Sequence, residues 1–281
     1  MNHRPKVVLI TGGSSGIGYE ASQLLAQQGH RVYAAARRTE LMEPLKAAGV
    51  VPLPLDVTNE QSRQQCVAAV VEAEGRIDVL VNNAGYGFFG AIECVPLGEA
   101  RRQMEVNVFG LAEMCRLVLP TMRRQHSGRI INIASIAGRA VFPMGGWYNV
   151  SKYSVEALSD ALRMELRPLG IEVAIIEPGC ISTDWGRIAA DHLEQSSRGT
   201  AYESFGLGEA ALLRWAYTGQ RMSPPSAIAR TIARAATARR PRTRYRLGRF
   251  STLTTLGHAL LPTRCWDALL MKLMSTQIKT P

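Results

Sequence analysis

Short apolar runs alternate with amphipathic segments along most of the chain. The runs have the length and composition of strands buried on both faces of a parallel sheet, and the segments between them repeat their apolar positions at helical spacing. The predicted strands are residues 6–10, 31–36, 50–55, 77–81, 128–134, 171–176 and 242–247. The predicted helices follow the first run as far as Gly29 and then cover residues 40–48, 60–73, 101–123, 147–166 and 226–238. This alternation predicts an α/β fold, a doubly wound parallel sheet with its ligand at the carboxyl ends of the strands.

Two segments depart from the alternation. Residues 183–222 are predicted to form an irregular loop and lid over a substrate, and residues 250–274 show a short amphipathic pattern. We therefore expect one domain over residues 1–249 and a C-terminal helical extension over residues 250–281. The extension is expected to cover the substrate mouth, to pack on a second subunit or to lie on a membrane surface.

Composition narrows the class of protein. With 281 residues, of which 46% are apolar, the chain is long enough for one large domain or two small ones. It has no apolar run of the ~18 residues that a membrane span needs and no segment like a signal peptide. The five cysteines are scattered and odd in number, which predicts reduced thiols in a cytoplasmic protein. The spacing of His and Cys predicts no metal site.

The net charge of +10 is concentrated in the C-terminal third. Residues 211–265 contain no Asp or Glu. The arginines there are Arg214, Arg221, Arg230, Arg234, Arg239, Arg240, Arg242, Arg244, Arg246, Arg249 and Arg264. A solvated basic face is one interpretation, and contact with an anionic membrane surface or an acidic partner such as acyl carrier protein is the other. No nucleic acid is expected, because the arginines are not interleaved with exposed aromatic residues.

A glycine-rich turn follows the first predicted strand and precedes a helix. It reads Thr11-Gly12-Gly13-Ser14-Ser15-Gly16-Ile17-Gly18. Free backbone N–H groups and the positive end of the helix dipole make such a turn suited to a pyrophosphate, although many glycine-rich turns are only tight turns. The flanking strand and helix favour the phosphate interpretation.

The end of the second predicted strand indicates which dinucleotide is bound. A dinucleotide fold is expected to carry an acidic residue there, which binds the hydroxyls of the adenosine ribose. This chain has Ala36 instead, followed by Arg37 and Arg38. A guanidinium binds a 2′-phosphate through two hydrogen bonds, so the pattern favours NADP(H) over NAD(H). The alternative is that both arginines are solvated loop charges.

A tyrosine and a lysine four residues apart provide candidate acid–base chemistry. Tyr148 and Lys152 lie one helical turn apart and share a face, and Ser135 ends the strand that precedes their helix. A free phenol titrates near ~10, and a neighbouring ammonium is expected to lower that pKa. The three residues predict a proton-transfer site, with Tyr148 as acid or base and Ser135 as a hydrogen-bond donor to a carbonyl oxygen. The alternative is a chance pair on a helix.

Taken in order, these pieces resemble the short-chain dehydrogenase/reductase family over residues 6–185. The resemblance rests on the glycine-rich turn, Asp56, residues 82–85 (Asn-Asn-Ala-Gly), Asn107, Ser135, Tyr148 with Lys152, and Pro178-Gly179 with Thr183. It implies one Rossmann-like domain with a seven-stranded parallel sheet. It also implies a catalytic set of Ser135, Tyr148, Lys152 and Asn107, the last holding a proton-relay water, and a homodimer or homotetramer joined through the two long helices.

The resemblance also implies the residues that bind NADP(H). They are Thr11, Gly12, Ser14, Ser15, Gly16, Ile17, Gly18, Arg37, Arg38, Asp56, Val57, Asn83, Ala84, Gly85, Tyr148, Lys152, Pro178, Gly179, Ile181 and Thr183. Lys152 is expected at the nicotinamide ribose, and Ile181 and Thr183 at the carboxamide. From its position alone, Asp56 is expected either to meet the adenine ring or to cap the next helix.

Bulky apolar residues in three loops predict a hydrophobic substrate cleft. They are Phe88, Val141, Phe142, Met144, Trp147 and Trp185. They favour a hydrophobic secondary alcohol or ketone, such as a steroid, a retinoid or a long acyl chain, over a sugar. The segments 35–38 and 85–87 resemble the 17β-hydroxysteroid and retinol dehydrogenase branch. A 3-ketoacyl thioester reductase and a non-catalytic NADPH-sensing protein are the competing hypotheses.

Overall fold

The computed structural model describes residues 4–217, 222–248 and 251–278. Within them, one parallel sheet has the strand order β3-β2-β1-β4-β5-β6-β7. The strands are β1 (Val7–Thr11), β2 (Arg31–Ala36), β3 (Val51–Pro54), β4 (Val79–Asn82), β5 (Gly128–Ile133), β6 (Ile171–Pro178) and β7 (Arg244–Leu247). The predicted seven-stranded, doubly wound sheet is confirmed. Its order reverses between β1 and β4, which opens a crevice at the carboxyl ends of these strands.

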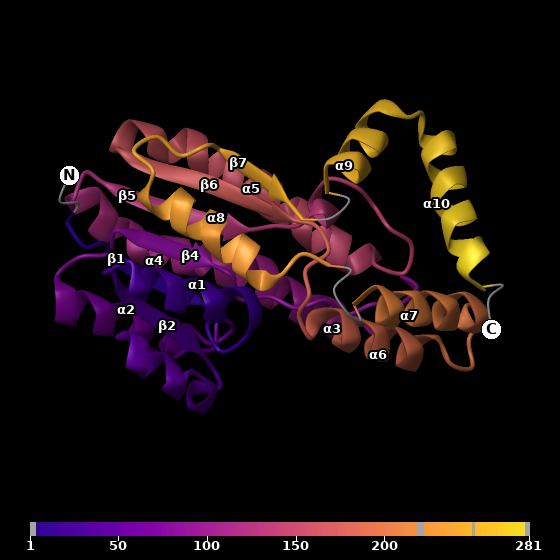
Figure 1. Cartoon of the computed structure of the whole chain (residues 1–281), viewed down its shortest axis with the longest axis horizontal. Helices are drawn as coiled ribbons and strands as arrows, with labels where there is room; N and C mark the ends of the chain where they lie inside the picture. Colours follow the sequence, from indigo (N-terminus) through magenta and orange to yellow (C-terminus); the bar gives the residue numbers. More distant parts are fainter. Residues whose placement is uncertain (1–3, 218–221, 249–250, 279–281) are drawn as a thin grey trace.

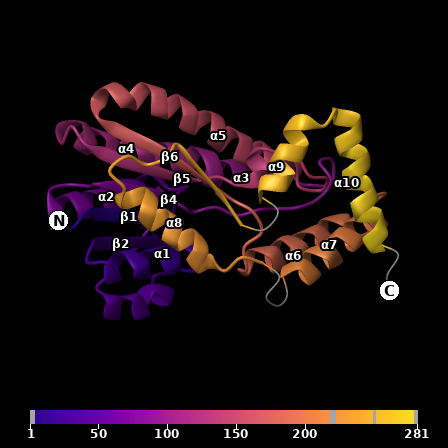
Figure 2. The same cartoon turned by 45° about the horizontal axis from the view of Figure 1, so that its top comes forward.

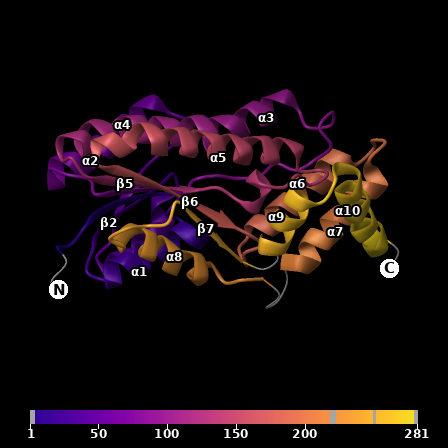
Figure 3. The ribbon, with the colours of Figure 1, turned by 90° about the horizontal axis from the view of Figure 1, so that it is seen from above.

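Helices cover both faces of the sheet (Figures 1 and 3). On one face lie α2 (Glu60–Glu74), α4 (Gly110–Arg124) and α5 (Gly146–Leu166); on the other lie α1 (Gly16–Gln27) and α8 (Pro225–Thr237). The short helices are η1 (Thr39–Ala48), η3 (Ile136–Gly138) and η4 (Arg167–Leu169). Leu9 and Ile10 are both fully buried, one in each core, as expected for a strand covered on both faces.

The predicted helix 101–123 is interrupted by a π-helical turn. The structure has α3 (Leu97–Met104), the π-turn η2 (Glu105–Phe109) and then α4. Asn107 lies in the π-turn, where its amide oxygen accepts a hydrogen bond from the N–H of Tyr86 (3.0 Å) and its amide nitrogen donates to the carbonyl of Tyr86 (2.9 Å). A widened turn thus lets a buried amide pair with a neighbouring loop, which fits the observation that π-turns occur at functional sites.

The segment predicted to be an irregular lid is helical. It forms α6 (Trp185–Ser197) and α7 (Glu203–Tyr217), which pack together at the end of the sheet opposite the N-terminus (Figure 1). Ala189, Leu193 and Ala210 are buried between them. The apolar residues of this segment do recur at helical spacing. Many of them are small alanines and glycines, so the amphipathic pattern is weak.

Two further helices extend the chain beyond β7. They are α9 (Ser251–Leu260) and α10 (Thr263–Ile278), which form a bent arm whose second helix packs against α7 (Figure 2). The predicted boundary between domain and extension, at residues 249–250, lies outside the described residues. None of the helices in the described ranges is long and apolar enough to cross a membrane.

Candidate active site

The glycine-rich turn brings backbone close to backbone at the end of β1. Gly12 has a φ of +70°, and a Cβ on Gly18 would lie 2.3 Å from the carbonyl oxygen of Gly12, so neither position tolerates a side chain. Thr11 fixes the neighbouring strand end, because its hydroxyl accepts hydrogen bonds from the N–H groups of Asn83 and Ala84, both at 3.0 Å. These contacts leave the N-terminus of α1 open to the crevice and thereby provide the cradle that a pyrophosphate requires.

Two exposed arginines lie beside this cradle. Arg37 and Arg38 follow the last residue of β2, and no acidic residue ends that strand. Asp56 lies across from them and accepts hydrogen bonds from the N–H (2.9 Å) and the hydroxyl (2.7 Å) of Thr58. Asn59, and not Asp56, caps helix α2. The predicted capping role of Asp56 is therefore wrong, and its carboxylate faces the crevice near Arg37.

The predicted catalytic side chains meet at the carboxyl end of β5. Ser135 follows β5 directly, and its hydroxyl is hydrogen-bonded to the phenol of Tyr148 on α5. Lys152 lies one turn further along α5, and its ammonium donates to the carbonyl of Ile133 (2.9 Å). The nitrogen is 5.8 Å from the centre of the Tyr148 ring. The three side chains thus form one polar group at the base of the cleft.

Burial dominates the titration of this group. It raises the pKa of Tyr148 to about 12, against the hydrogen bond from Ser135, which lowers it. Burial also lowers the pKa of Lys152 to about 8. The net shift of the phenol pKa is therefore upward, opposite to the lowering that the sequence analysis expected from Lys152. Tyr148 is held in its protonated form at neutral pH.

Asn107 lies behind this group. Besides its two bonds to Tyr86, its amide donates to the hydroxyl of Ser151 on α5 (3.0 Å). A Cβ on Gly85 would lie 3.1 Å from the Asn107 amide oxygen and 3.8 Å from the Lys152 nitrogen. Asn107 therefore ties the loop after β4 to the helix that carries Tyr148. Its predicted role in holding a proton-relay water stays a prediction.

A single cleft of about 2060 Å³ joins these features. Because typical ligand pockets measure about 300–1000 Å³, it has room for two ligands side by side. Its lining includes the predicted residues Gly12, Ser14, Ser15, Gly16, Ile17, Arg37, Arg38, Asp56, Val57, Asn83, Ala84, Gly85, Ser135, Tyr148, Lys152, Pro178, Gly179, Ile181 and Thr183. Thr11, Gly18 and Asn107 lie behind this lining and support it.

The substrate end of the cleft differs from the prediction. Phe142 and Trp185 line it, whereas Phe88 stacks on His192 at 4.6 Å and Val141 is 48% exposed outside it. Met144 and Trp147 also lie outside the lining. Phe89, the neighbour of Phe88, was expected at the cleft and does line it. The wall is completed by residues that the sequence analysis did not single out for this role, listed here by element: Ile188 and His192 of α6; Glu209, Leu212, Leu213 and Tyr217 of α7; Leu253 of α9; Leu261 in the turn after it; Trp266, Leu269 and Leu270 of α10.

An aromatic cluster encloses the tyrosine. Trp185 lies 5.2 Å from the Tyr148 ring, Phe89 lies 5.6 Å from it, and Tyr217 lies 6.1 Å from Trp185. The Tyr217 ring occupies the place of a side chain on Gly186, where a Cβ would approach it to 2.1 Å. The lid thus packs aromatic surface directly against the candidate acid. Gly186, directly after Trp185 at the start of α6, makes room for the Tyr217 ring of α7.

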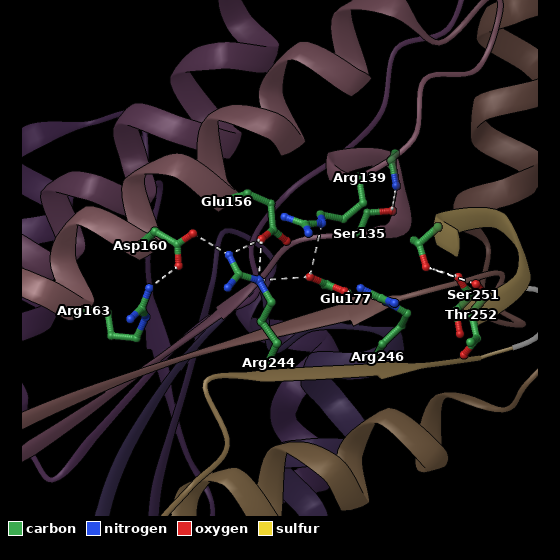
Figure 4. A network of polar contacts seen from close by, with 12 residues as sticks. Ser135, Arg139, Glu156, Asp160, Arg163, Glu177, Arg244, Arg246, Ser251 and Thr252 are labelled. Carbon is green, nitrogen blue, oxygen red and sulfur yellow. Dashed lines mark hydrogen bonds and ion pairs between the residues drawn. The ribbon is translucent and has the colours of Figure 1, made fainter. Parts of the chain in front are cut away.

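Two of the arginines in the basic C-terminal third support the site from behind (Figure 4). Arg244 on β7 bonds Glu156 (3.1 Å) and Asp160 (2.6 Å) on α5 and lies 3.2 Å from Glu177 at the end of β6. Arg246 bonds Glu177 at 2.9 Å. Glu177 is fully buried, and Glu156 lies one turn after Lys152. The solvated-face interpretation is therefore wrong for Arg244 and Arg246; Arg221 and Arg249 lie outside the described residues.

Comparison with known proteins places this site in a family. The chain matches the family model of short chain dehydrogenases over residues 6–193. It is 34% identical over 263 residues to the probable short-chain type dehydrogenase/reductase VdlC of Helicobacter pylori, covering 94% of this chain and 96% of that protein. It is also 44% identical over 181 residues to the 3-ketodihydrosphingosine reductase of Bacteroides thetaiotaomicron, covering 64% of this chain and 65% of that protein.

Solved structures agree in fold. A short-chain dehydrogenase from Streptomyces avermitilis superposes with a TM-score of 0.80 at 31% identity, covering 97% of this chain and 98% of that one. A short-chain dehydrogenase/reductase from Burkholderia phymatum in complex with NAD gives 0.75 at 27% identity, covering 87% and 90%. A serine dehydrogenase complexed with NADP⁺ gives 0.72 at 27% identity, covering 86% and 94%. In sequence and in fold, the chain belongs to the short-chain dehydrogenase/reductase family of oxidoreductases.

Proposed function

We propose that the protein is an NADP(H)-dependent oxidoreductase that transfers hydride between the nicotinamide and a hydrophobic ketone or secondary alcohol. One observation carries the proposal: a single cleft joins the glycine-rich cradle, the Ser135–Tyr148–Lys152 group and an apolar wall of lid residues. A cofactor at the cradle and a substrate under the lid would meet at Tyr148. Bound NADPH would supply the hydride that reduces the carbonyl carbon.

The residues present fit a dinucleotide with a 2′-phosphate. The close approach of Gly12 and Gly18 leaves room for a pyrophosphate, and the serines of the turn add hydrogen-bond donors. Arg37 and Arg38 are exposed at the cleft edge with no carboxylate at the end of β2. Such an edge suits a phosphate and lacks the acidic residue at the end of the second strand that binds a free ribose diol, which supports NADP(H) over NAD(H).

The protonation state of the site favours reduction. Burial holds the pKa of Tyr148 at about 12, so at neutral pH the phenol carries the proton that a reduced carbonyl oxygen needs. Ser135 bonds the same oxygen from the side, and Lys152 is anchored on the Ile133 carbonyl close to the ring. Oxidation would require the ionised phenol, which becomes populated only as the pH rises.

The apolar wall supports a lipid-like substrate. Leu212 and Leu213 of the lid and Leu269 and Leu270 of α10 line the same space as Trp185. Burial of a hydrocarbon chain against this apolar surface lowers the free energy of binding. A 3-ketodihydrosphingosine reductase among the relatives also supports a lipid ketone. An NADPH oxidation assay should therefore compare lipid ketones with steroid ketones, retinoid ketones and 3-ketoacyl thioesters. Turnover of the thioesters alone would favour the 3-ketoacyl thioester reductase.

We predict that Arg37→Ala raises the KM for NADPH roughly 10- to 100-fold, as the loss of a charge-assisted hydrogen bond to a phosphate would. The KM for NADH should change by less than ~3-fold, because NADH offers no phosphate to this side chain. Fluorescence titration and steady-state kinetics with both nucleotides measure the effect. Arg240→Ala, at an exposed arginine outside the cleft lining, is the control. Equal effects of Arg37→Ala on both nucleotides would contradict the 2′-phosphate assignment.

A further inference from the structure

Glu209 is a carboxylate on the cleft side of the lid. It lies near the middle of α7 and lines the cleft together with Leu212 and Leu213. Its Oε2 atom is buried and has no hydrogen-bond partner among the residues that the structure describes. Glu209 is also the one acidic residue between Glu203 and Asp267 in the sequence. Glu209 thus presents an unpaired carboxylate oxygen to a largely apolar part of the cleft, where Asp184 and His192 of the lid are further polar side chains.

The acidic residues within α6 are paired with arginines. Asp191 and Glu194 of α6 both bond Arg214 of α7, at 2.9 Å and 2.6 Å. Arg214 therefore pairs with the carboxylates of α6, and no ion pair joins it to Glu209. Burial raises the pKa of Glu209 to about 7, with no charged neighbour in the described ranges contributing to the shift. A buried carboxylate without a hydrogen-bond partner costs folding free energy, and a bound ligand that donates a hydrogen bond to Glu209 would offset that cost.

The surroundings of Glu209 limit what that partner is. Trp266, Leu269 and Leu270 of α10 and Trp185 of α6 line the same cleft, as do Tyr148 and Lys152. A ligand in this space therefore has an apolar body and reaches the candidate acid at one place and the Glu209 carboxylate at another. A protonated amine complements a carboxylate through a charge-assisted hydrogen bond, which is stronger than a bond to a neutral hydroxyl.

We propose that Glu209 binds a protonated amine on the substrate, so that the cleft selects long-chain ketones or alcohols that also carry an amino group. This inference rests on the proposed function, and it names the substrate class within it. Glu209 is then a specificity residue: it holds the substrate in place and takes no part in the transfer of hydride or proton.

The test compares matched ketones in the NADPH oxidation assay. The probes are long-chain ketones of equal length that carry an amino group, a hydroxyl group or neither, with the substituent at increasing distance from the carbonyl. In Glu209→Gln, which keeps the size and the oxygen acceptor, the KM for the best amino ketone should rise roughly 10- to 100-fold. The KM for the unsubstituted ketone should stay within ~3-fold. Glu203→Gln, on the same helix, should change neither.

Binding of decylamine and decanol provides a readout without turnover. Decylamine should raise the melting temperature of the native protein more than decanol does, and Glu209→Gln should remove the difference. If no ketone is turned over but this difference is found, the proposed function fails and the amine site stands. Equal KM changes for amino and unsubstituted ketones, a preference for the hydroxyl ketone, or equal effects of the amine and the alcohol would each overturn the inference.

Discussion

Replacing Tyr148 by Phe is expected to lower kcat for carbonyl reduction roughly 10²- to 10⁴-fold, the usual contribution of a positioned general acid. The substitution removes only the hydroxyl, which is hydrogen-bonded to Ser135, and leaves the aromatic packing against Trp185 and Phe89 in place. Binding of NADPH, measured by fluorescence titration, should change by less than ~3-fold because the cradle is untouched. The loss should therefore appear in kcat.

Tyr153→Phe is the matched control. It removes a hydroxyl from a partly exposed tyrosine on the same helix, outside the cleft lining, and should leave kcat unchanged. Retention of most of the activity by Tyr148→Phe would rule out the assigned acid. An NADPH-sensing protein without catalysis predicts no turnover in either variant and an unchanged response to NADPH.

Arg244→Met is expected to destabilise the protein by about 3 kcal/mol, within the range found when one partner of a buried ion pair is removed. The substitution leaves Glu156 and Glu177 close together, with Arg246 and Arg139 as the remaining cations, at 2.9 Å and 4.0 Å from Glu177. Chemical denaturation at neutral pH measures the loss. Arg242→Met, two residues earlier and exposed, should cost less than ~0.5 kcal/mol. Equal losses in the two variants would mean that the buried network contributes nothing.

The stability that Arg244→Met loses should depend on pH in a defined direction. Burial and the neighbouring Glu177 raise the pKa of Glu156 to about 7, and Arg244 acts against this shift. A carboxyl with a raised folded-state pKa stabilises the fold while it is protonated and loses that contribution as the pH rises through the folded value. Without Arg244 the pKa of Glu156 rises further, so the two proteins differ in the ionisation of Glu156 only near and above pH 7, and the deficit of Arg244→Met should grow as the pH rises from about 7.

Much of the fold was readable from the sequence because its strands are buried on both faces. Runs such as Val7–Thr11 and Val79–Asn82 have no solvent side and therefore need apolar residues at nearly every position. The candidate site could be predicted for a related reason. Phosphate binding needs a backbone that comes close to the ligand, and the turn that allows this needs glycine at Gly12 and Gly18. Proton transfer needs few side-chain types, so Tyr148 and Lys152 were conspicuous at their spacing.

The parts that could not be predicted depend on contacts between distant segments. The contacts of Arg244 with Glu156 and Glu177 had no signal in the sequence, because they follow from the register in which β7 pairs with β6. The lid helices were missed because alanine and glycine pack closely without a strong apolar period. Glu209 had no local signal either: a single Glu in a helix is ordinarily exposed, and its burial depends on how other helices pack against α7.

Cys180 is a cysteine in the cleft wall that a thiol reagent can label. Its thiol lies in the cleft wall and is hydrogen-bonded to Tyr217, and burial raises its pKa. At neutral pH an alkylating reagent should therefore label exposed Cys265 first and Cys180 more slowly, while buried Cys66 and Cys115 resist. Because any ligand that fills the cleft shields Cys180, its labelling rate reports occupancy even for compounds that the enzyme does not transform.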